Sequence, residues 1–347
     1  MLSRVANPPN PWLASTVDWL GEPPPAKLQV FLDSTREILS RNDSPDIPFT
    51  WSVNPYRGCL HGCAYCYARP SHEYLSFGAG TDFERNIVVK PDAAPLLREA
   101  FERPRWKGEV VVFSGNTDCY QPLEASYGIT RQCLEVCLEH RNPVGIITKA
   151  PLIERDLALL VALAEVTELH VTVSVPFADA GHARALEPYV APPQRRIETI
   201  RRLAAAGLSV GVNVAPVIPG LSDGEMPEVL ELARAAGARH AGMILVRLPG
   251  PVATVFEERL REQLPARADR VMARIAETRG GRKNDPRFGA RMRGEGEYAE
   301  LIRALFERTC ARLGYEPRPR STESTFHRPA PPPPPQLELF GGPVKPA

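Results

Sequence analysis

The sequence has few lysines, no long apolar run and no excess of one charge. Its 347 residues include six lysines against 36 arginines, and the formal net charge is only +1. A net charge this small excludes an overall electrostatic attraction to nucleic acid or membranes, so any basic surface must be local. Because lysine is scarce, the position of each lysine is informative.

No apolar stretch has the length that spans a bilayer, and the N-terminal MLSRVANPPNPWL lacks the continuous apolar segment of a secretion signal. We therefore expect a cytoplasmic protein without a membrane partner. The seven cysteines are odd in number and three of them lie close together, which fits metal-bound or free thiols in a reducing compartment better than disulfides. The hydrophobic content of 43% is sufficient for a globular core.

The sequence predicts an α/β fold preceded by an arm. Residues 1–45 contain NPPNPW and GEPPPAK and are expected to be extended, with one short helix at STREILSR, 34–41. Between 46 and 250, short β-branched runs alternate with amphipathic stretches, the pattern of βα units around a parallel sheet. The expected strands are 49–55, 108–115, 144–150, 168–175, 208–216 and 240–249, with helices near 91–103, 129–141, 154–166, 194–207 and 226–238. Six such units are too few for a closed eight-stranded barrel, so we predict a partial (β/α)6 TIM-type barrel.

The remainder of the chain is predicted to lie outside the barrel. Residues 251–315 should form a helical C-terminal extension, interrupted by the basic stretch GGRKNDPRFGARMRG. This stretch predicts a phosphate-binding patch beside the barrel mouth, and the alternative is a solvated face or a surface that closes on acidic barrel loops. Residues 316–347 have too little apolar content to form a core, and we expect a disordered, proline-rich tail.

Three cysteines, Cys59, Cys63 and Cys66, lie within eight positions of the stretch NPYRGCLHGCAYCYARP, and no fourth cysteine is near. A site with three thiolates can hold a 4Fe-4S cluster and leave one iron open to a chelating molecule. The alternative is a zinc site completed by His61 or His72. Zinc ribbons and fingers, however, usually combine two short ligand-bearing loops, and the sequence has only one.

The spacing Cys-x3-Cys-x2-Cys, with Tyr65 before the last cysteine, resembles the cluster motif of radical S-adenosylmethionine (radical SAM) enzymes. The resemblance implies that Cys59, Cys63 and Cys66 bind a 4Fe-4S cluster and that SAM chelates the fourth iron. It also implies reductive cleavage of SAM to a 5'-deoxyadenosyl radical, and hence an electron donor such as a flavodoxin or a ferredoxin.

If this resemblance holds, the other strand ends should supply SAM contacts, because parallel strands gather their carboxyl ends at one edge. The segment SGNTD occupies the place of the Gly-Gly-Glu motif that binds the SAM amino group. The segment PVIPGLSD resembles the adenine-binding pattern Gly-x-Ile-x-Gly-x-x-Glu. The cofactor-binding candidates are therefore Gly115, Asn116, Thr117, Asp118, Ser174, Glu187, Ile218 and Gly220. A plain turn, a surface ion pair or a structural hydrogen bond is the alternative for each.

Three more residues are candidates for catalysis. Lys149, at the end of the third strand, offers a cation to the SAM carboxylate or to a substrate anion, and Arg247 ends the sixth strand. Cys119 is a candidate hydrogen donor because spore photoproduct lyases use a cysteine near the second strand end, while an ordinary buried thiol is the alternative.

Longer words, such as NPYRGCLHGCAYCYARPSHEY and FSGNTDCYQPLE, resemble bacterial relatives of spore photoproduct lyase that are described as DNA repair photolyase-like. The resemblance covers roughly residues 30 to 315 and implies a radical SAM enzyme that acts on DNA in a lyase or repair reaction. A peptide or small-molecule substrate, or a metal-bearing DNA-associated module without catalysis, remain alternatives.

The tail contains QLELF after five prolines, which resembles the pentapeptide that binds the bacterial sliding clamp. In that role Leu337, Leu339 and Phe340 would enter an apolar groove and Gln336 would make polar contacts. The alternative is that this segment folds back on its own domain.

Overall fold

The computed structural model of the chain describes residues 27–317 and 324–329. Its main sheet has the strand order β10-β9-β8-β7-β6-β3-β2. The strands are β2 (Leu39–Arg41), β3 (Trp51–Val53), β6 (Val111–Phe113), β7 (Val144–Thr148), β8 (Leu169–Ser174), β9 (Val210–Val217) and β10 (His240–Leu245). Neighbours from β3 to β10 are parallel, whereas β2 pairs antiparallel with β3. Within the described residues β10 pairs with β9 alone, so the barrel is open and the predicted partial barrel is confirmed.

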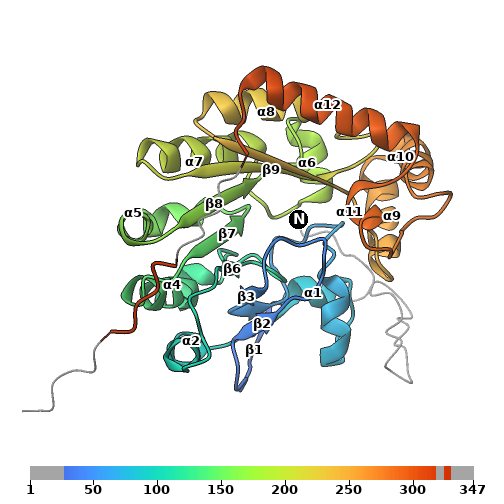
Figure 1. Cartoon of the computed structure of the whole chain (residues 1–347). Coiled ribbons are helices and arrows are strands. Elements are labelled where there is room, and N and C mark those ends of the chain that lie inside the picture. Colours follow the sequence, from blue (N-terminus) through green and yellow to red (C-terminus); the bar gives the residue numbers. More distant parts are fainter. Residues whose placement is uncertain (1–26, 318–323, 330–347) are drawn as a thin grey trace, which may run out of the picture.

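Helices cover the outer face of this curved sheet (Figure 1). They are α2 (Ala93–Glu102), α4 (Ile129–Glu139), α5 (Leu157–Val166), α7 (Pro193–Ala205) and α8 (Met226–Ala235). The core between sheet and helices consists of β-branched residues of the strands and leucine, isoleucine and alanine of the helices. All six predicted strands and all five predicted helices are present, because strands buried on both faces and one-sided helices have distinct sequence patterns.

The N-terminal part of the chain differs from the prediction. The helix expected at 34–41 is wrong, because Leu39–Arg41 forms β2 at the edge of the main sheet, where Leu39 faces Val53 and Arg41 faces Trp51. Pairing with β3 outweighs the local helix propensity of this segment. A second sheet, also not predicted, has the order β1-β5-β4 and contains β1 (Gln29–Leu32), β4 (Tyr56–Arg57) and β5 (Asn86–Val89).

Short helices occupy the loops around the barrel mouth. They are η1 (Arg69–Leu75), α1 (Thr81–Arg85), α3 (Glu124–Tyr127), η2 (Pro151–Asp156) and α6 (Ala180–Leu186). The predicted helical extension contains α9 (Val252–Gln263), α10 (Pro265–Glu277), α11 (Ala290–Arg293) and α12 (Glu297–Leu313). Apolar residues of α9 and α10 share a core with Ile218 and Cys63 of the barrel loops. In the part of the chain that the structure describes, no helix combines the length and apolarity needed to cross a bilayer.

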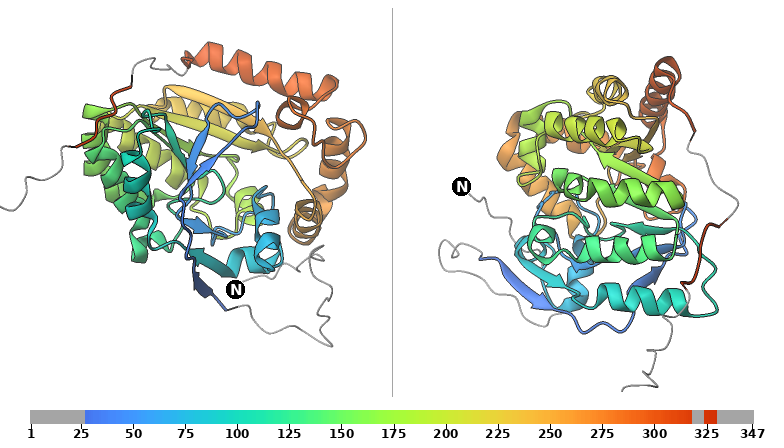
Figure 2. Two further views of the ribbon diagram at one scale, coloured as in Figure 1. Left: turned by 60° about the horizontal axis from the view of Figure 1, so that its bottom comes forward. Right: turned by 90° about the vertical axis from the view of Figure 1, so that its left-hand side faces the viewer.

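Residues 324–329 form a strap across the amino-terminal edge of the barrel (Figure 2). The Arg328 guanidinium donates hydrogen bonds to the carbonyl oxygens of Phe101, Arg103 and Trp106, at 3.2, 2.9 and 2.8 Å. Phe326 packs against the rings of Phe101 and His140. The prediction of disorder for 316–347 therefore does not extend to this strap, because Phe326 finds an aromatic pocket that the local sequence does not reveal. The QLELF segment lies outside the described residues.

Candidate active site

A cavity of about 220 Å³ opens at the carboxyl ends of the parallel strands. The cysteine loop, residues 58–66, forms one wall, and the ends of β6 to β10 form the others. The predicted site residues that line it are Cys59, Cys63, Cys66, Asn116, Thr117, Asp118, Lys149, Ser174 and Arg247. Residues separated by up to 188 positions therefore meet in one cavity, as the strand-end argument expected.

Two glycines give the cysteine loop its shape. Gly58 and Gly62 have φ angles of 76° and 64°, in the left-handed region that favours glycine. A Cβ at Gly58 would lie 2.8 Å from the His72 ring, and one at Gly62 would lie 2.9 Å from the Tyr189 ring. The loop is thus closely packed from behind, while its three cysteines face the cavity.

The loop after β6 is joined to the cysteine loop by side-chain hydrogen bonds. Thr117 Oγ1 donates to the carbonyl oxygen of Gly58 at 2.6 Å, and Gln121 Nε2 donates to the same oxygen at 3.1 Å. Gln121 Oε1 accepts from the Leu60 N–H at 3.0 Å. Because Gln121 is fully buried, water cannot replace these bonds, and the two loops hold each other in place.

Arg69 holds the same loop from the side away from the cavity. Its Nε and Nη2 atoms donate to the Cys63 carbonyl oxygen at 3.0 and 2.9 Å, and Nη2 also reaches Gly62 O at 3.2 Å. Its Nη1 atom donates to the carbonyl oxygens of Ala79 and Gly80 at 2.9 and 3.0 Å. Neither Arg69 nor Gln121 was among the sequence candidates, although both lie in the sequence words that carried the family resemblance.

Burial determines the protonation of the three thiols. It raises the pKa of Cys59 to about 12, with a further contribution from Asp118. Burial also raises the pKa of Cys63, where the Glu187 carboxylate adds to the shift, and the pKa of Cys66, where Arg69 opposes it. The thiols are therefore protonated near neutral pH, and a metal that binds them must displace their protons. Three thiols on one wall of a cavity fit a cluster that leaves one iron exposed.

The zinc alternative has no preformed site. Among the residues that the structure describes, no three His, Cys, Asp or Glu side chains are arranged around a single metal ion. His72 Nε2 lies 2.8 Å from the carbonyl oxygen of Asn86, and the His61 ring faces Asp118, with Nδ1 to Oδ2 at 3.4 Å. Burial lowers the pKa of His61. A 4Fe-4S cluster binds each cysteine through a different iron, so its thiolates need not converge on one point.

Asp118 connects the loop after β6 to the end of β7. Its Oδ1 accepts hydrogen bonds from the Thr148 hydroxyl at 2.7 Å and from the Tyr120 N–H at 2.9 Å. Its Oδ2 accepts from the Lys149 N–H at 2.7 Å. The carboxylate thus orients the end of β7, and the Lys149 ammonium lies 5.8 Å from the centre of the Tyr65 ring at the cavity wall.

Glu187 belongs to a buried cluster behind the cavity rather than to its lining. Its carboxylate accepts hydrogen bonds from the Tyr65 hydroxyl and from Arg196 Nη2, the latter at 2.5 Å. Arg196 Nη1 donates to the Ser174 carbonyl oxygen at 3.0 Å, which joins this cluster to the end of β8. Glu187 and Arg196 are only 2% and 1% exposed, so the pair supports Tyr65 and Ser174 from behind.

Four other sequence candidates do not line the cavity. Gly115 contributes its carbonyl oxygen, which accepts a 2.6 Å hydrogen bond from the Tyr67 hydroxyl. Ile218 is buried in the core shared with α9 and α10, and a Cβ at Gly220 would contact Arg274. Cys119 is fully buried in the main core.

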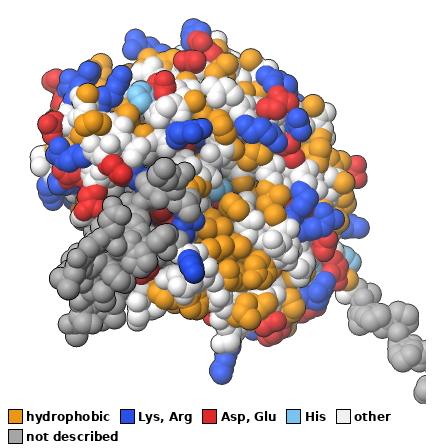
Figure 3. All heavy atoms as spheres, turned by 180° about the vertical axis from the view of Figure 1, so that it is seen from behind, with side chains coloured by type: hydrophobic (Ala, Val, Ile, Leu, Met, Phe, Trp, Pro, Cys, Tyr) orange, Lys and Arg blue, Asp and Glu red, His pale blue; other side chains and the backbone are white. Residues whose placement is uncertain are grey.

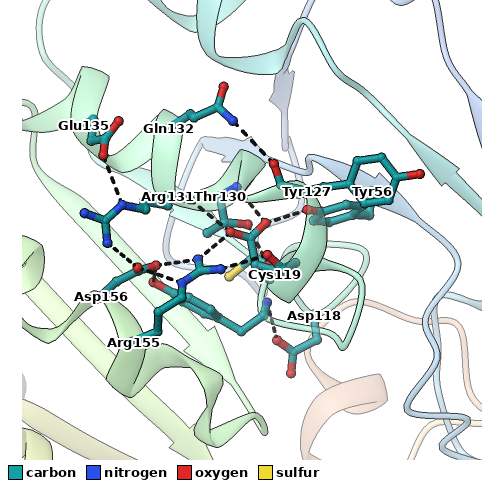
Figure 4. Close-up of polar contacts among 12 residues, drawn as sticks. Tyr56, Asp118, Cys119, Tyr127, Thr130, Arg131, Gln132, Glu135, Arg155 and Asp156 are labelled. Atoms are coloured by element: carbon teal, nitrogen blue, oxygen red, sulfur yellow. Dashed lines mark hydrogen bonds and ion pairs between the residues drawn. The ribbon is translucent and has the colours of Figure 1, made fainter.

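Figure 4 shows why Cys119 lies outside the cavity. Its carbonyl oxygen accepts from Thr130 Oγ1 at 2.6 Å, and its N–H donates to Ser114 Oγ at 2.9 Å. These bonds direct the residue into a network that contains Tyr56, Arg155 and Asp156. Burial raises the pKa of the Cys119 thiol, and the structure gives no contact between this thiol and the cavity.

Arg247 lies at the cavity rim. Its Nη1 is 3.7 Å from the sulfur of Met292, and its guanidinium carbon lies 5.9 Å from the centre of the Tyr67 ring. Within the described part of the chain its buried Nε has no hydrogen-bond partner. Burial and the nearby Arg291 lower the pKa of Arg247. The guanidinium as a whole lines the cavity, where it offers a cation to an anionic ligand.

Several basic residues of the stretch 279–293 pair with acids, two of which, Asp46 and Glu257, lie in other segments and one of which, Asp285, lies within the stretch. Arg291 binds Asp46, Lys283 binds Glu257 at 2.5 Å, and Arg287 binds Asp285 at 2.5 Å. On the face shown in Figure 3, basic and acidic side chains are interspersed. The interpretation of this stretch as a surface that closes on acidic loops is therefore favoured over that of an open phosphate patch.

Comparison with known proteins identifies one matching family and several sequence relatives. The family described as the radical SAM superfamily matches residues 53–233. The uncharacterized protein Rv2578c of Mycobacterium tuberculosis is 40% identical over 206 residues, which cover 59% of this chain and 61% of that protein. The uncharacterized protein MJ0683 of Methanocaldococcus jannaschii is 27% identical over 200 residues, 58% of this chain and 72% of that one. The chain thus spans less than two thirds of the mycobacterial relative.

Among solved structures, spore photoproduct lyase complexed with dinucleoside spore photoproduct has a TM-score of 0.60 at 16% identity, covering 82% of this chain and 79% of that one. A mutant of the same lyase with bound AdoMet and dinucleoside spore photoproduct has a TM-score of 0.56 at 15% identity, covering 82% and 78%. At this identity the similarity establishes a shared fold.

Proposed function

Because the chain belongs to the radical SAM superfamily, we propose that its cysteine loop binds a 4Fe-4S cluster through Cys59, Cys63 and Cys66 and that the adjoining cavity binds S-adenosylmethionine. The observation that carries this proposal is that the three thiols share one cavity with polar residues from four strand ends. When bound, the reduced cluster would transfer an electron to SAM, releasing methionine and a 5'-deoxyadenosyl radical that abstracts hydrogen from the substrate.

The residues of the cavity are suited to hold SAM beside the cysteine loop. Lys149 provides a cation for its carboxylate, and Asn116 and Ser174 provide hydrogen-bonding groups. Apolar side chains at the ends of β9 and β10, among them Pro216 and Ile244, line the remaining wall and would exclude water from a reactive intermediate. Asp118 also lines the cavity and orients Lys149 through the backbone, so it would support SAM binding from the loop after β6.

We propose that the substrate is a nucleic acid, in a cytoplasmic repair or lyase reaction. The structural similarity to a lyase complexed with a dinucleoside photoproduct supports this substrate class, as does the Arg247 guanidinium in the cavity lining. The test is to measure 5'-deoxyadenosine formation by the reconstituted enzyme with ultraviolet-irradiated duplex DNA, undamaged duplex DNA or a peptide mixture. Stimulation by irradiated DNA alone supports repair, whereas stimulation by peptides alone contradicts a nucleic-acid substrate.

We further propose two protein partners. A flavodoxin or ferredoxin would reduce the cluster, which the cysteine loop would hold at the wall of the cavity. A sliding clamp would bind Gln336, Leu337, Leu339 and Phe340, outside the described residues. The strap at the amino-terminal edge supports the second proposal, because it fixes residues 324–329, which precede QLELF in the sequence, on the edge of the barrel opposite the cavity. Clamp binding by the full chain, and its loss when Leu339 and Phe340 are changed to Ala, would test it.

A further inference from the structure

A buried ion pair lies directly behind the cysteine loop. Arg69 and Glu84 are 0% and 2% exposed, and Arg69 Nη2 lies 2.5 Å from Glu84 Oε1. A buried ion pair rarely stabilises a protein more than apolar residues of the same volume would, because both charges lose their hydration. Folding stability alone is therefore a weak reason for a buried pair in this position.

The charges of this pair lie close to the cysteine ligands. Arg69 follows Cys66 by three residues, and its N–H donates to the Cys66 carbonyl oxygen at 3.2 Å. Its guanidinium holds the carbonyl oxygen of Cys63 through two hydrogen bonds. The Glu84 carboxyl carbon is only 3.3 Å from the position a Cβ on Gly62 would take, so both charges contact the loop between the ligands.

The surroundings allow these charges to act over this distance. The guanidinium packs against the Phe83 ring at 5.2 Å, and Phe83 itself is fully buried. Screening by solvent is weak in such an environment, so a charge that contacts the cysteine loop would change the free energy of adding an electron to a cluster held by that loop. A cation favours the reduced cluster, and an anion disfavours it.

We propose that the Arg69–Glu84 pair sets the reduction potential of the cluster in the cysteine loop. Arg69 is a positioning residue that fixes the backbone of the loop and supplies positive charge, and Glu84 limits that charge. Reduction of the cluster adds one electron from the external donor. The pair would determine the net positive charge that stabilises this added electron. The inference rests on the proposed cluster and extends it to two residues outside the cavity.

The test is the cluster midpoint potential of the reconstituted full chain, measured by a dye-mediated redox titration that electron paramagnetic resonance follows. Glu84→Gln keeps an acceptor for Arg69 but removes the negative charge, so the reduced cluster should be favoured at least tenfold, a rise of about 59 mV for one electron. Arg69→Gln removes the cation and should lower the potential. Glu139→Gln on α4, which removes the charge partner of the exposed Arg98 on α2, is the matched control and should leave the potential unchanged.

A third variant separates charge from position. Arg69→Lys keeps the cation but loses the planar fork that holds the carbonyl oxygens, so the potential should stay close to that of the wild type while the cluster-free protein unfolds at lower temperature. Equal potentials in wild type, Glu84→Gln and Arg69→Gln at full iron content overturn the inference. A wild-type chain that assembles no cluster overturns the proposed function as well, which distinguishes the two failures. If Glu84→Gln does not assemble a cluster, the Arg69→Gln variant tests the inference alone. A lower midpoint potential supports it, and an unchanged or higher midpoint potential overturns it.

Discussion

The Thr117 hydroxyl donates a 2.6 Å hydrogen bond to the carbonyl oxygen of Gly58, the residue directly before the first cysteine of the loop. The two residues are 59 positions apart, and the bond is buried. It connects the end of the second parallel strand to the loop that follows the first. The position of the cysteines therefore depends on the loop after β6 as much as on their own sequence.

Gln121 provides the strongest test of this dependence. Gln121→Leu keeps roughly the size of the side chain but leaves the Leu60 N–H without its acceptor, at a cost of about 1–3 kcal/mol. It also removes one of the two hydrogen bonds to Gly58 O, which keeps the one from Thr117. We expect a lower free energy of unfolding in urea and less iron bound after reconstitution. Gln132→Leu, on the exposed surface of α4, is the control. Equal stability of the two variants would show that Gln121 does not hold the loop.

The ligand assignment predicts a clear difference between cysteines. Cys63→Ala should prevent assembly of the cluster, since two thiolates remain at the cavity. Cys310→Ala, on α12 and far from the cavity lining, should retain the iron and sulfide content of the wild type. Iron and acid-labile sulfide per chain are the measurements, and four irons per chain in the Cys63 variant would refute the assignment.

Glu187 was a candidate for SAM binding, but the structure places it in a buried ion pair. Glu187→Ala leaves the charge of Arg196 without a partner, and breaking a buried pair in this way costs about 3–5 kcal/mol. We expect this loss in urea denaturation of the cluster-free protein, where no SAM is bound. A variant with wild-type stability and weaker SAM binding would instead support a direct role in cofactor binding.

Because the strap packs on Gly108, we expect Gly108→Ala to lower the free energy of unfolding more than an ordinary glycine-to-alanine change does. A Cβ at Gly108 would lie 2.1 Å from Phe326 Cβ, whereas one at Gly128 meets nothing within 4 Å, and both glycines have similar positive φ angles, 78° and 63°. Gly108→Ala and Gly128→Ala therefore share the backbone strain, and only the former displaces the strap. We expect a larger loss of stability, by at least about 1 kcal/mol, for Gly108→Ala.

Limited proteolysis supplies the second measurement for the strap. Displacement of Phe326 should expose the chain near 324–329 to cleavage in the Gly108 variant and not in the Gly128 variant. Equal loss of stability and equal cleavage in both variants would mean that the strap does not pack on Gly108 in solution.

The barrel was predictable because its evidence is local. Strands such as VGIIT and LHVTVS are buried on both faces and appear in the sequence as short apolar runs. The helices between them are amphipathic, and their apolar residues recur with the helical period. The edge strand Leu39–Arg41 was mistaken for a helix because its structure depends on pairing with a segment ten residues later. The small β1-β5-β4 sheet was missed for the same reason, since β1 and β5 are more than fifty residues apart.

Site residues at the ends of the parallel strands could be predicted from the sequence. Site residues that act through contacts between distant segments could not. The thiols, Lys149 and Arg247 follow from the position of the motifs on a parallel sheet. Arg69 and Gln121 act through backbone carbonyl and N–H groups, which no residue pattern identifies. Cys119 directly follows Asp118, which lines the cavity, yet it lies in the core, so proximity in sequence was misleading.

The central claim is tested most directly by anaerobic reconstitution with iron and sulfide, addition of SAM and dithionite, and chromatographic measurement of 5'-deoxyadenosine. The account predicts that the wild type produces 5'-deoxyadenosine and that Cys63→Ala produces none. An intact cluster in the wild type without any 5'-deoxyadenosine would contradict radical SAM chemistry at this cavity.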